Sequence, residues 1–220
     1  MIGIGNIRIR KARIIYRAGF GIGLAAMIFT FLLLKYPPSA SNHNQAPKFR
    51  GEMSKIVLLQ ELSPAPLTTF LDSDEIAIDL SRFRGKVVLL NFWATWCYPC
   101  LLEMPSLNSL QAELGGKQFI VVALSIDRGG LAEVKRYFRK HELGELSLYR
   151  DPLGTVGRAF RLIGVPASYI IDHNGIVRGY FPGPADWNSS NARAVIRHFV
   201  AQVANDKDAV NATGATNQPE

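Results

Sequence analysis

The only two cysteines of the chain lie three residues apart, at a point where a strand pattern gives way to a helical one. The run KVVLLNFWA at 86–94 is apolar and rich in β-branched and aromatic residues, which is typical of a strand buried on both faces. The run PCLLEMPSLNSLQAEL at 99–114 carries apolar residues at close to helical spacing. We therefore expect Cys97 at a strand-to-helix junction and Cys100 one helical turn further on.

This placement favours reversible thiol chemistry over a structural crosslink. A disulfide stabilises a protein more when it closes a longer loop, and a two-residue gap closes almost none. Backbone N–H groups and the dipole at a helix start stabilise a thiolate, so Cys97 is expected to be the nucleophile. Cys100 would then attack the mixed disulfide formed at Cys97 and release the product. We expect no cofactor besides this redox-active disulfide.

The patterns around the cysteines predict an α/β domain over residues 60–205. Two short strands are expected around the turn DSDE within 66–80, and a hairpin with an Asn174-Gly175 turn is expected over 167–181. Further strands are predicted at 117–127 and 146–151, and further helices at 130–143, 153–164 and 185–205. Strands that alternate with helices indicate a central mixed β-sheet flanked by helices.

Several motifs of this domain resemble one known family. FWATWCYPC resembles the thioredoxin active site, Pro105 matches a proline of the thioredoxin helix, and GVPASYIID resembles the cis-proline segment. With the hairpin segment before the cysteines, the domain resembles the membrane-anchored thioredoxin-like TlpA, ResA and CcmG-like proteins of bacteria, TlpA most of all. The resemblance implies a thioredoxin-like fold with an N-terminal β-hairpin extension, and thiol-disulfide oxidoreductase activity.

The resemblance also implies further site residues. A cis Val165-Pro166 bond would present the backbone of Val165 to an extended substrate peptide, whereas the alternative is a plain tight turn. Trp96 either shields the thiols or contacts the substrate. The buried aspartate of thioredoxin is replaced here by Asn91, whose amide cannot shuttle protons. Glu103 matches a glutamate of the resembling group, and is either a proton-transfer group near the second cysteine or a solvated residue in an early helical turn.

The first 35 residues carry a membrane signal. They hold six basic and no acidic residues, and 17 uncharged residues separate Arg17 from Lys35, which is enough to span a bilayer. Basic residues before such a run predict a cytoplasmic N-terminus. We expect a cytoplasmic segment at 1–17, a transmembrane signal-anchor at 18–34 and a tether at 35–59. The alternative is a signal peptide cleaved near Ser39–Ser41.

The other 185 residues are nearly neutral, with 19 basic and 18 acidic side chains, which argues against nucleic acid as a partner. The polar end, 206–220, is predicted to be a disordered tail. Together with the membrane signal, the resemblance to bacterial proteins implies a single-pass protein of the bacterial inner (cell) membrane, with its catalytic domain in the periplasm or outside.

The resemblance implies that such a protein reduces cysteine pairs in clients such as apocytochromes c or copper-site proteins of cytochrome oxidase. A membrane electron-transfer partner would supply the reductant. The alternative is a Cu(I)-binding metallochaperone, because two soft thiolates can hold Cu(I). The histidine closest after the proline segment, His173, lies in a predicted turn and is a poor third ligand. An inactive peptide-binding module would leave the paired thiols without a purpose.

Overall fold

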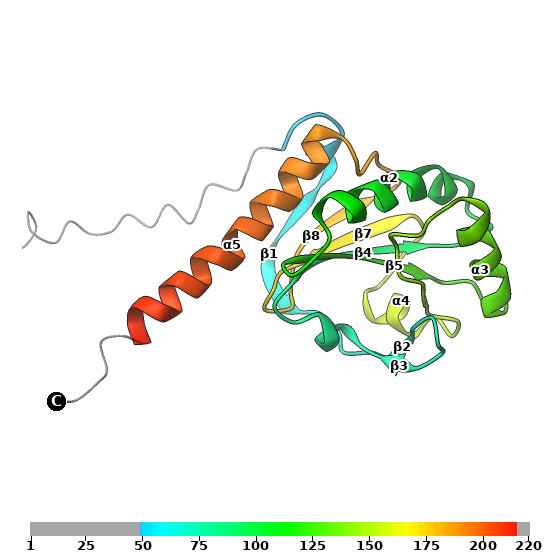
Figure 1. The fold of residues 1–220 in the computed structure, drawn as a ribbon, viewed down its shortest axis with the longest axis horizontal. Coiled ribbons are helices and arrows are strands. Elements are labelled where there is room, and N and C mark those ends of the chain that lie inside the picture. The colour runs from blue at the N-terminus through cyan, green and yellow to red at the C-terminus, as the bar shows by residue number, and fades with distance from the viewer. Residues whose placement is uncertain (1–48, 215–220) are drawn as a thin grey trace, which may run out of the picture. The chain divides into compact units, whose positions relative to one another are not determined.

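The apolar run before the cysteines forms strand β4 (Val87–Trp93), every residue of which is buried. The computed structural model describes residues 49–214, and side chains for residues 49–203. The other strands of the sheet are β1 (Val57–Pro64), β2 (Phe70–Leu71), β3 (Ala77–Ile78), β5 (Phe119–Ser125), β6 (Tyr149–Arg150), β7 (Ala167–Ile171) and β8 (Ile176–Pro182). They form one mixed sheet in the order β1-β8-β7-β4-β5-β6-β2-β3, in which β4, β5 and β6 run parallel (Figure 1). The predicted α/β thioredoxin-like architecture is confirmed.

Strand β4 separates two hydrophobic cores, because successive side chains of a strand point to opposite faces. Alternate residues contribute to the first core, namely Val87, Leu89 and Trp93. The residues between them contribute to the second core, namely Val88, Leu90 and Phe92. Asn91 is in register with the first set, so its side chain lies on the first face.

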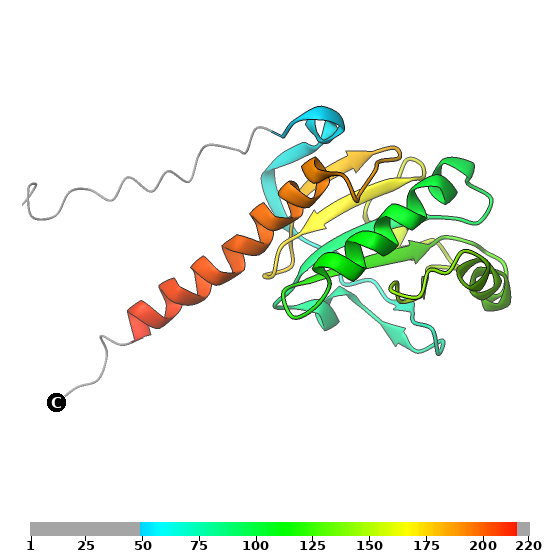
Figure 2. The same cartoon turned by 45° about the horizontal axis from the view of Figure 1, so that its top comes forward.

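Helices cover both faces of the sheet. They are α2 (Tyr98–Leu114), α3 (Leu131–Lys140), α4 (Thr155–Ala159) and α5 (Ser190–Gly214), with the 3₁₀ turns η1 (Gly51–Lys55) and η2 (Leu80–Phe83). Side chains of α2, α3 and α5 fill the first core, whereas side chains of α4 and η2 pack in the second. Figure 1 shows α2 and α4 on opposite sides of the sheet, and Figure 2 shows α2 and α5 in front of it. The face covered by α2 is the one that matters for the cysteines, since α2 begins directly after them.

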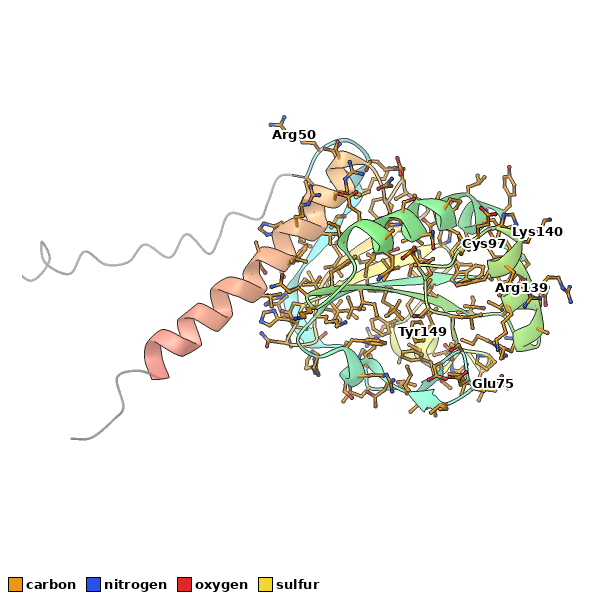
Figure 3. All side chains as sticks on the ribbon, in the orientation of Figure 1. Arg50, Glu75, Cys97, Arg139, Lys140 and Tyr149 are labelled. Carbon is orange, nitrogen blue, oxygen red and sulfur yellow. A yellow bond between two sulfur atoms is a disulfide. The ribbon has the colours of Figure 1, made fainter. Side chains whose placement is uncertain are left out.

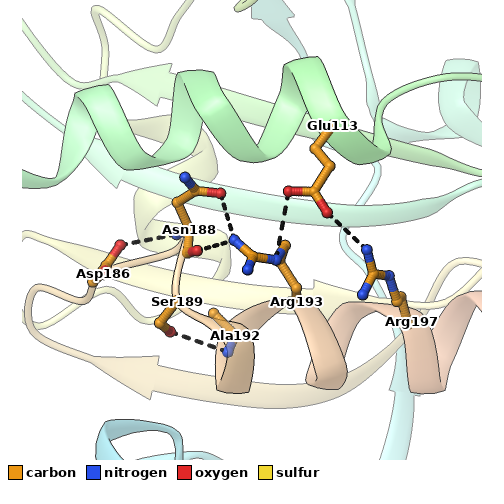
Figure 4. A network of polar contacts seen from close by, with 7 residues as sticks. All are labelled: Glu113, Asp186, Asn188, Ser189, Ala192, Arg193 and Arg197. Atoms are coloured by element: carbon orange, nitrogen blue, oxygen red, sulfur yellow. Dashed lines mark hydrogen bonds and ion pairs between the residues drawn. The ribbon is translucent and has the colours of Figure 1, made fainter.

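Helices α2 and α5 are also joined by a polar network (Figure 4). The Glu113 carboxylate lies 3.4 Å from Arg193 Nε and 2.7 Å from Arg197 Nη2. Arg193 donates in turn to the backbone and side chain of Asn188, just before α5. Figure 4 shows these contacts bridging the end of α2 and the start of α5, and Asn188 connects the segment between β8 and α5 to the same network.

The ordered domain begins earlier than predicted. The expected tether, 35–59, includes η1 and the start of β1 within the part that the structure describes. Met53 of η1 is fully buried in the first core. The sequence pattern missed β1 because this strand pairs with β8 alone and none of its residues is fully buried, so no apolar alternation marks it. The predicted anchor, 18–34, lies outside the described residues.

Two helices differ in length from the prediction. The helix expected over 153–164 is the short α4, which ends at Ala159. The last helix, expected over 185–205, begins at Ser190 and continues to Gly214, so most of the predicted disordered tail is helical. The tail residues are polar, and a polar pattern does not distinguish a solvated helix from a disordered chain. Between residues 49 and 214, no helix is long and apolar enough to cross a membrane.

Candidate active site

Cys97 and Cys100 form a disulfide at the start of α2, with an S–S distance of 2.05 Å. Cys97 is the N-cap residue of the helix, and its Sγ accepts a hydrogen bond from the Cys100 N–H at 3.3 Å. The Cys97 N–H donates to the Ala94 carbonyl at 3.1 Å, which closes the turn between β4 and α2. Pro99 lies in the first helical turn, where its missing N–H is not needed. The predicted strand-to-helix junction is confirmed, and Figure 3 shows Cys97 at one end of the domain.

The two cysteines differ in exposure. The exposed fraction is 6% for Cys97 and 0% for Cys100. Only Cys97 therefore presents surface to another molecule while the disulfide is closed, although both residues belong to the first core.

Glu103 lies in a closed polar pocket one turn beyond Cys100. Its side chain is 3% exposed. Oε1 accepts a hydrogen bond from Asn91 Nδ2 at 2.7 Å, and Oε2 accepts one from the Ala185 N–H at 3.0 Å. The indole of Trp187 also faces the carboxylate, although outside hydrogen-bond geometry. The alternative of a solvated glutamate is wrong, because the loop after β8 covers the side chain.

Burial raises the pKa of Glu103 from the ordinary value of 4.5 to about 7. The hydrogen bonds from Asn91 and Ala185 lower the pKa and partly oppose burial, while the negative charge of Glu52 raises it further. Residues three apart on a helix are neighbours on its surface, so Glu103 and Cys100 share one face of α2. A carboxyl group with this pKa can bind or release a proton near neutral pH, on the helix face that also carries Cys100.

Asn91 contributes to the site in a way that the sequence analysis missed. Its Nδ2 donates both to Glu103 and to Ser168 Oγ, the latter at 3.0 Å. Its Oδ1 is buried and has no hydrogen-bond partner among the described residues. The signal for this role was present in the alternation of β4, which directs Asn91 toward the face that α2 covers.

The peptide bond between Val165 and Pro166 is cis, as predicted. Pro166 is buried, and its carbonyl accepts a hydrogen bond from the Gly183 N–H at 3.0 Å. The next residue, Ala167, pairs with Phe92 near the end of β4 that leads to the cysteines. Val165 is partly exposed and packs against both cores. The cis-proline segment and the disulfide therefore both lie near the C-terminal end of β4.

Trp96 is one of the most exposed large side chains of the domain, with an exposed fraction of 68%. It lines a pocket of about 620 Å³ together with Thr95, Asp127 and Arg158. The buried Asp127 carboxylate holds the wall of this pocket, since it accepts hydrogen bonds from Thr95 Oγ1 at 2.7 Å and from Ser125 Oγ at 2.7 Å. Trp96 directly precedes Cys97, so a molecule bound in this pocket lies next to the disulfide.

No cluster of three or more His, Cys, Asp or Glu side chains with the spacing of a metal site occurs within residues 49–203. His173 follows Ile171, which pairs with Val88 at the opposite end of β4 from the cysteines. The structure therefore does not bring this histidine to the thiols.

Comparison with known proteins agrees with this geometry. The model of the AhpC/TSA family matches residues 62–180. The thiol-disulfide oxidoreductase ResA of Bacillus cereus (strain ATCC 10987 / NRS 248) is 33% identical over 129 residues, which cover 59% of this chain and 73% of the relative. The thiol:disulfide interchange protein DsbE of Pseudomonas fluorescens biotype C is 34% identical over 103 residues, covering 47% of this chain and 55% of the relative.

Solved structures share the fold. A thiol:disulfide interchange protein of the thioredoxin family from Chlorobium tepidum TLS superposes with a TM-score of 0.52 at 25% identity. The match covers 64% of this chain and 97% of that one. StoA from Bacillus subtilis, at 20% identity and a TM-score of 0.50, shares the fold alone.

Proposed function

The chain belongs to the AhpC/TSA family, as a thioredoxin-like thiol-disulfide oxidoreductase of the ResA/DsbE group, and we propose that it is a membrane-tethered reductant of disulfides in client proteins. The observation that carries the proposal is the unequal exposure of the two paired cysteines at a helix start. Cys97 is the nucleophile and Cys100 is the resolving thiol.

The exchange runs in two steps. The Cys97 thiolate attacks one sulfur of a client disulfide, forms a mixed disulfide and displaces the other client sulfur as a thiolate. Cys100 then loses its proton and attacks the Cys97 sulfur, which releases the second client thiolate. Two electrons pass from the dithiol to the client, and the protein is left with the Cys97–Cys100 disulfide.

Glu103 is the group that handles the proton in the second step. It takes the proton of the buried Cys100 thiol during reduction of the client, and returns it when the protein is reduced again. Its burial, its place on the face of α2 that carries Cys100 and its pKa near 7 support this role. Val165 and Pro166 bind the client backbone, and Trp96 lies beside the incoming client.

The finer identity of the protein is that of a TlpA-like protein, with the domain held in the periplasm by an anchor at 18–34. The basic cluster and the apolar run of the sequence support this topology. Clients are apocytochromes c or copper-site proteins of cytochrome oxidase, and a membrane electron-transfer partner returns the electrons. Intact mass analysis of the protein from its own membranes tests the anchor, because cleavage near Ser39–Ser41 would remove it.

The test of the function is covalent trapping in the native cell. Cys100→Ser stops the exchange after the first step, so clients should accumulate as mixed disulfides on Cys97 that a reducing agent releases. Cys97→Ser is the matched control and should trap no client. Equal trapping by both variants, or trapping by Cys97→Ser alone, would reverse the roles of the two cysteines.

A further inference from the structure

The outer face of α3 carries four cationic side chains, which we call the α3 cationic patch: Lys135, Arg136, Arg139 and Lys140. Three of them are exposed and Lys135 is partly buried. None forms an ion pair with any side chain of the part of the domain that the structure describes. The charges of this patch are therefore available to another molecule.

The patch adjoins the disulfide. Tyr137, on the inner side of α3, donates a hydrogen bond to the carbonyl of Leu101, the residue after Cys100, at 3.4 Å. Its ring centroid lies 5.4 Å from that of Trp93, the last residue of β4. Figure 3 shows Cys97, Arg139 and Lys140 at the same end of the domain. A protein that reaches Cys97 must therefore cover surface next to α3.

Charge is distributed unevenly along the chain. Residues 128–161, which include α3, hold eight basic and four acidic residues, whereas the rest of 36–220 holds 11 basic and 14 acidic residues. The near neutrality of the domain thus hides a cationic segment beside the active site. Such a segment attracts an oppositely charged partner and raises its association rate.

Exposed apolar side chains also lie within two residues of the cysteines along the chain. Trp96, Tyr98 and Leu102 are exposed by 68%, 68% and 64%, respectively. Apolar anchors with a charged rim are typical of a protein–protein interface. A flat lipid surface laid against this end of the domain would cover the disulfide, so a lipid surface fits these observations less well than a protein does.

We propose that the α3 cationic patch is the docking surface for an acidic segment of the protein that exchanges its disulfide with Cys97. This inference rests on the proposed function, because it assumes that Cys97 exchanges disulfides with another protein. It adds the chemistry of that partner: carboxylate side chains must lie near its reactive cysteine pair, on the side that meets α3.

The test uses three peptides with the same disulfide loop and with flanking residues that are acidic, neutral or basic. The reduced full-length protein is mixed with each peptide, and the second-order rate constant is measured at several salt concentrations. We expect the acidic peptide to react roughly tenfold faster than the basic peptide at low salt. The difference should shrink as salt rises, because exposed charges are screened over about 10 Å at 0.1 M ionic strength.

Variants test whether the preference for the acidic peptide comes from the α3 cationic patch. Arg136→Gln with Lys140→Gln, two exposed residues of the patch four positions apart on α3, should slow the acidic peptide severalfold and leave the neutral peptide unchanged. Gln is a good helix former, so α3 should persist. The matched control is Arg82→Gln with Lys86→Gln, which removes the same charges at the opposite end of β4 and should leave all three rates unchanged.

Two results would overturn the inference. The first is equal rates for the three peptides, and the second is an equal effect of the two double variants. Binding of the protein to anionic vesicles that is lost in the α3 variant, without any peptide preference, would assign the patch to a membrane instead. Failure of the wild type to reduce even the neutral peptide or dithiodipyridine would instead count against the proposed function.

Discussion

The paired sulfurs are chemically identical but differ in their surroundings. Cys97 caps α2 and keeps some exposed surface, whereas Cys100 is fully buried. We predict that reduced protein treated with limiting iodoacetamide near pH 7 is labelled mainly at Cys97. Peptide mass mapping measures the ratio, and the single variants Cys97→Ser and Cys100→Ser show the intrinsic rate of each remaining thiol. Preferential labelling of Cys100 would contradict the assignment.

Glu103 gives the site an ionisable group near neutral pH. If this carboxylate takes the proton of Cys100, Glu103→Gln should lower the rate of client reduction near pH 7 on the order of 10²-fold. The variant should also lose one ionisation near pH 7 from its pH–rate profile, because an amide does not titrate. The first step, measured by trapping in the Cys100→Ser background, should keep its rate. A uniform loss of rate with an unchanged profile would indicate a structural role alone.

Asn91 should set the titration of Glu103 through the bond from its Nδ2. A hydrogen bond donated to the charged carboxylate lowers the pKa of the carboxyl group, so removal of the donor raises that pKa. Asn91→Ala should therefore move the midpoint of the Glu103 titration above about 7. Carboxyl NMR shifts across pH measure the midpoint. Ser168→Ala, which removes only the other partner of Asn91, should leave it unchanged, and a downward shift in Asn91→Ala would be inconsistent with this account.

At the scale of elements, η1 is part of the domain rather than of a tether. Met53 is fully buried in the first core, so Met53→Ala should lower the free energy of unfolding by about 2–5 kcal/mol. Leu62→Ala is the matched control, since Leu62 of β1 is 49% exposed and its truncation should cost less than about 0.5 kcal/mol. Urea unfolding of both variants measures the difference. Equal effects would mean that η1 contributes no core packing.

The elements around the cysteines were predictable because their signals are local. The apolar run of β4 and the helical spacing of α2 are continuous in the sequence, so the junction at Cys97 could be located from them. The burial of Glu103 could not be predicted in this way. It depends on the N–H of Ala185, a residue 82 positions away, which lies beyond β8 and is brought to Glu103 by the tertiary fold.

The edges of the domain were harder to predict for a related reason. Strand β1 is a strand at the edge of the sheet and shows only partial burial, so its hydrophobic pattern is weak. The end of α5 is polar, and a helix there cannot be distinguished from a disordered segment by composition. The predicted start and end of the domain both differ from the structure because the sequences of these segments show no clear hydrophobic pattern.

At the scale of the whole molecule, the buried carboxyl of Glu103 links folding stability to pH. Its pKa is about 7 in the folded protein, and the ordinary value of 4.5 applies when the chain is unfolded. Between these two pH values the folded state binds more protons than the unfolded state. The free energy of unfolding therefore falls as pH rises through this window, and the contribution is fully present below pH 4.5.

The size of the linkage follows from the shift. Each unit of pKa corresponds to about 1.36 kcal/mol, so the loss between pH 4.5 and pH 8 should be at most about 3 kcal/mol. We predict that oxidised wild-type protein loses this much more stability over the window than oxidised Glu103→Gln, because the amide keeps the shape of the side chain and does not ionise. Urea unfolding at pH 4.5, 6 and 8 gives the two curves, and other titrating groups cancel in their difference. Parallel curves would mean that Glu103 titrates in the folded protein as it does in the unfolded chain, which its closed pocket opposes.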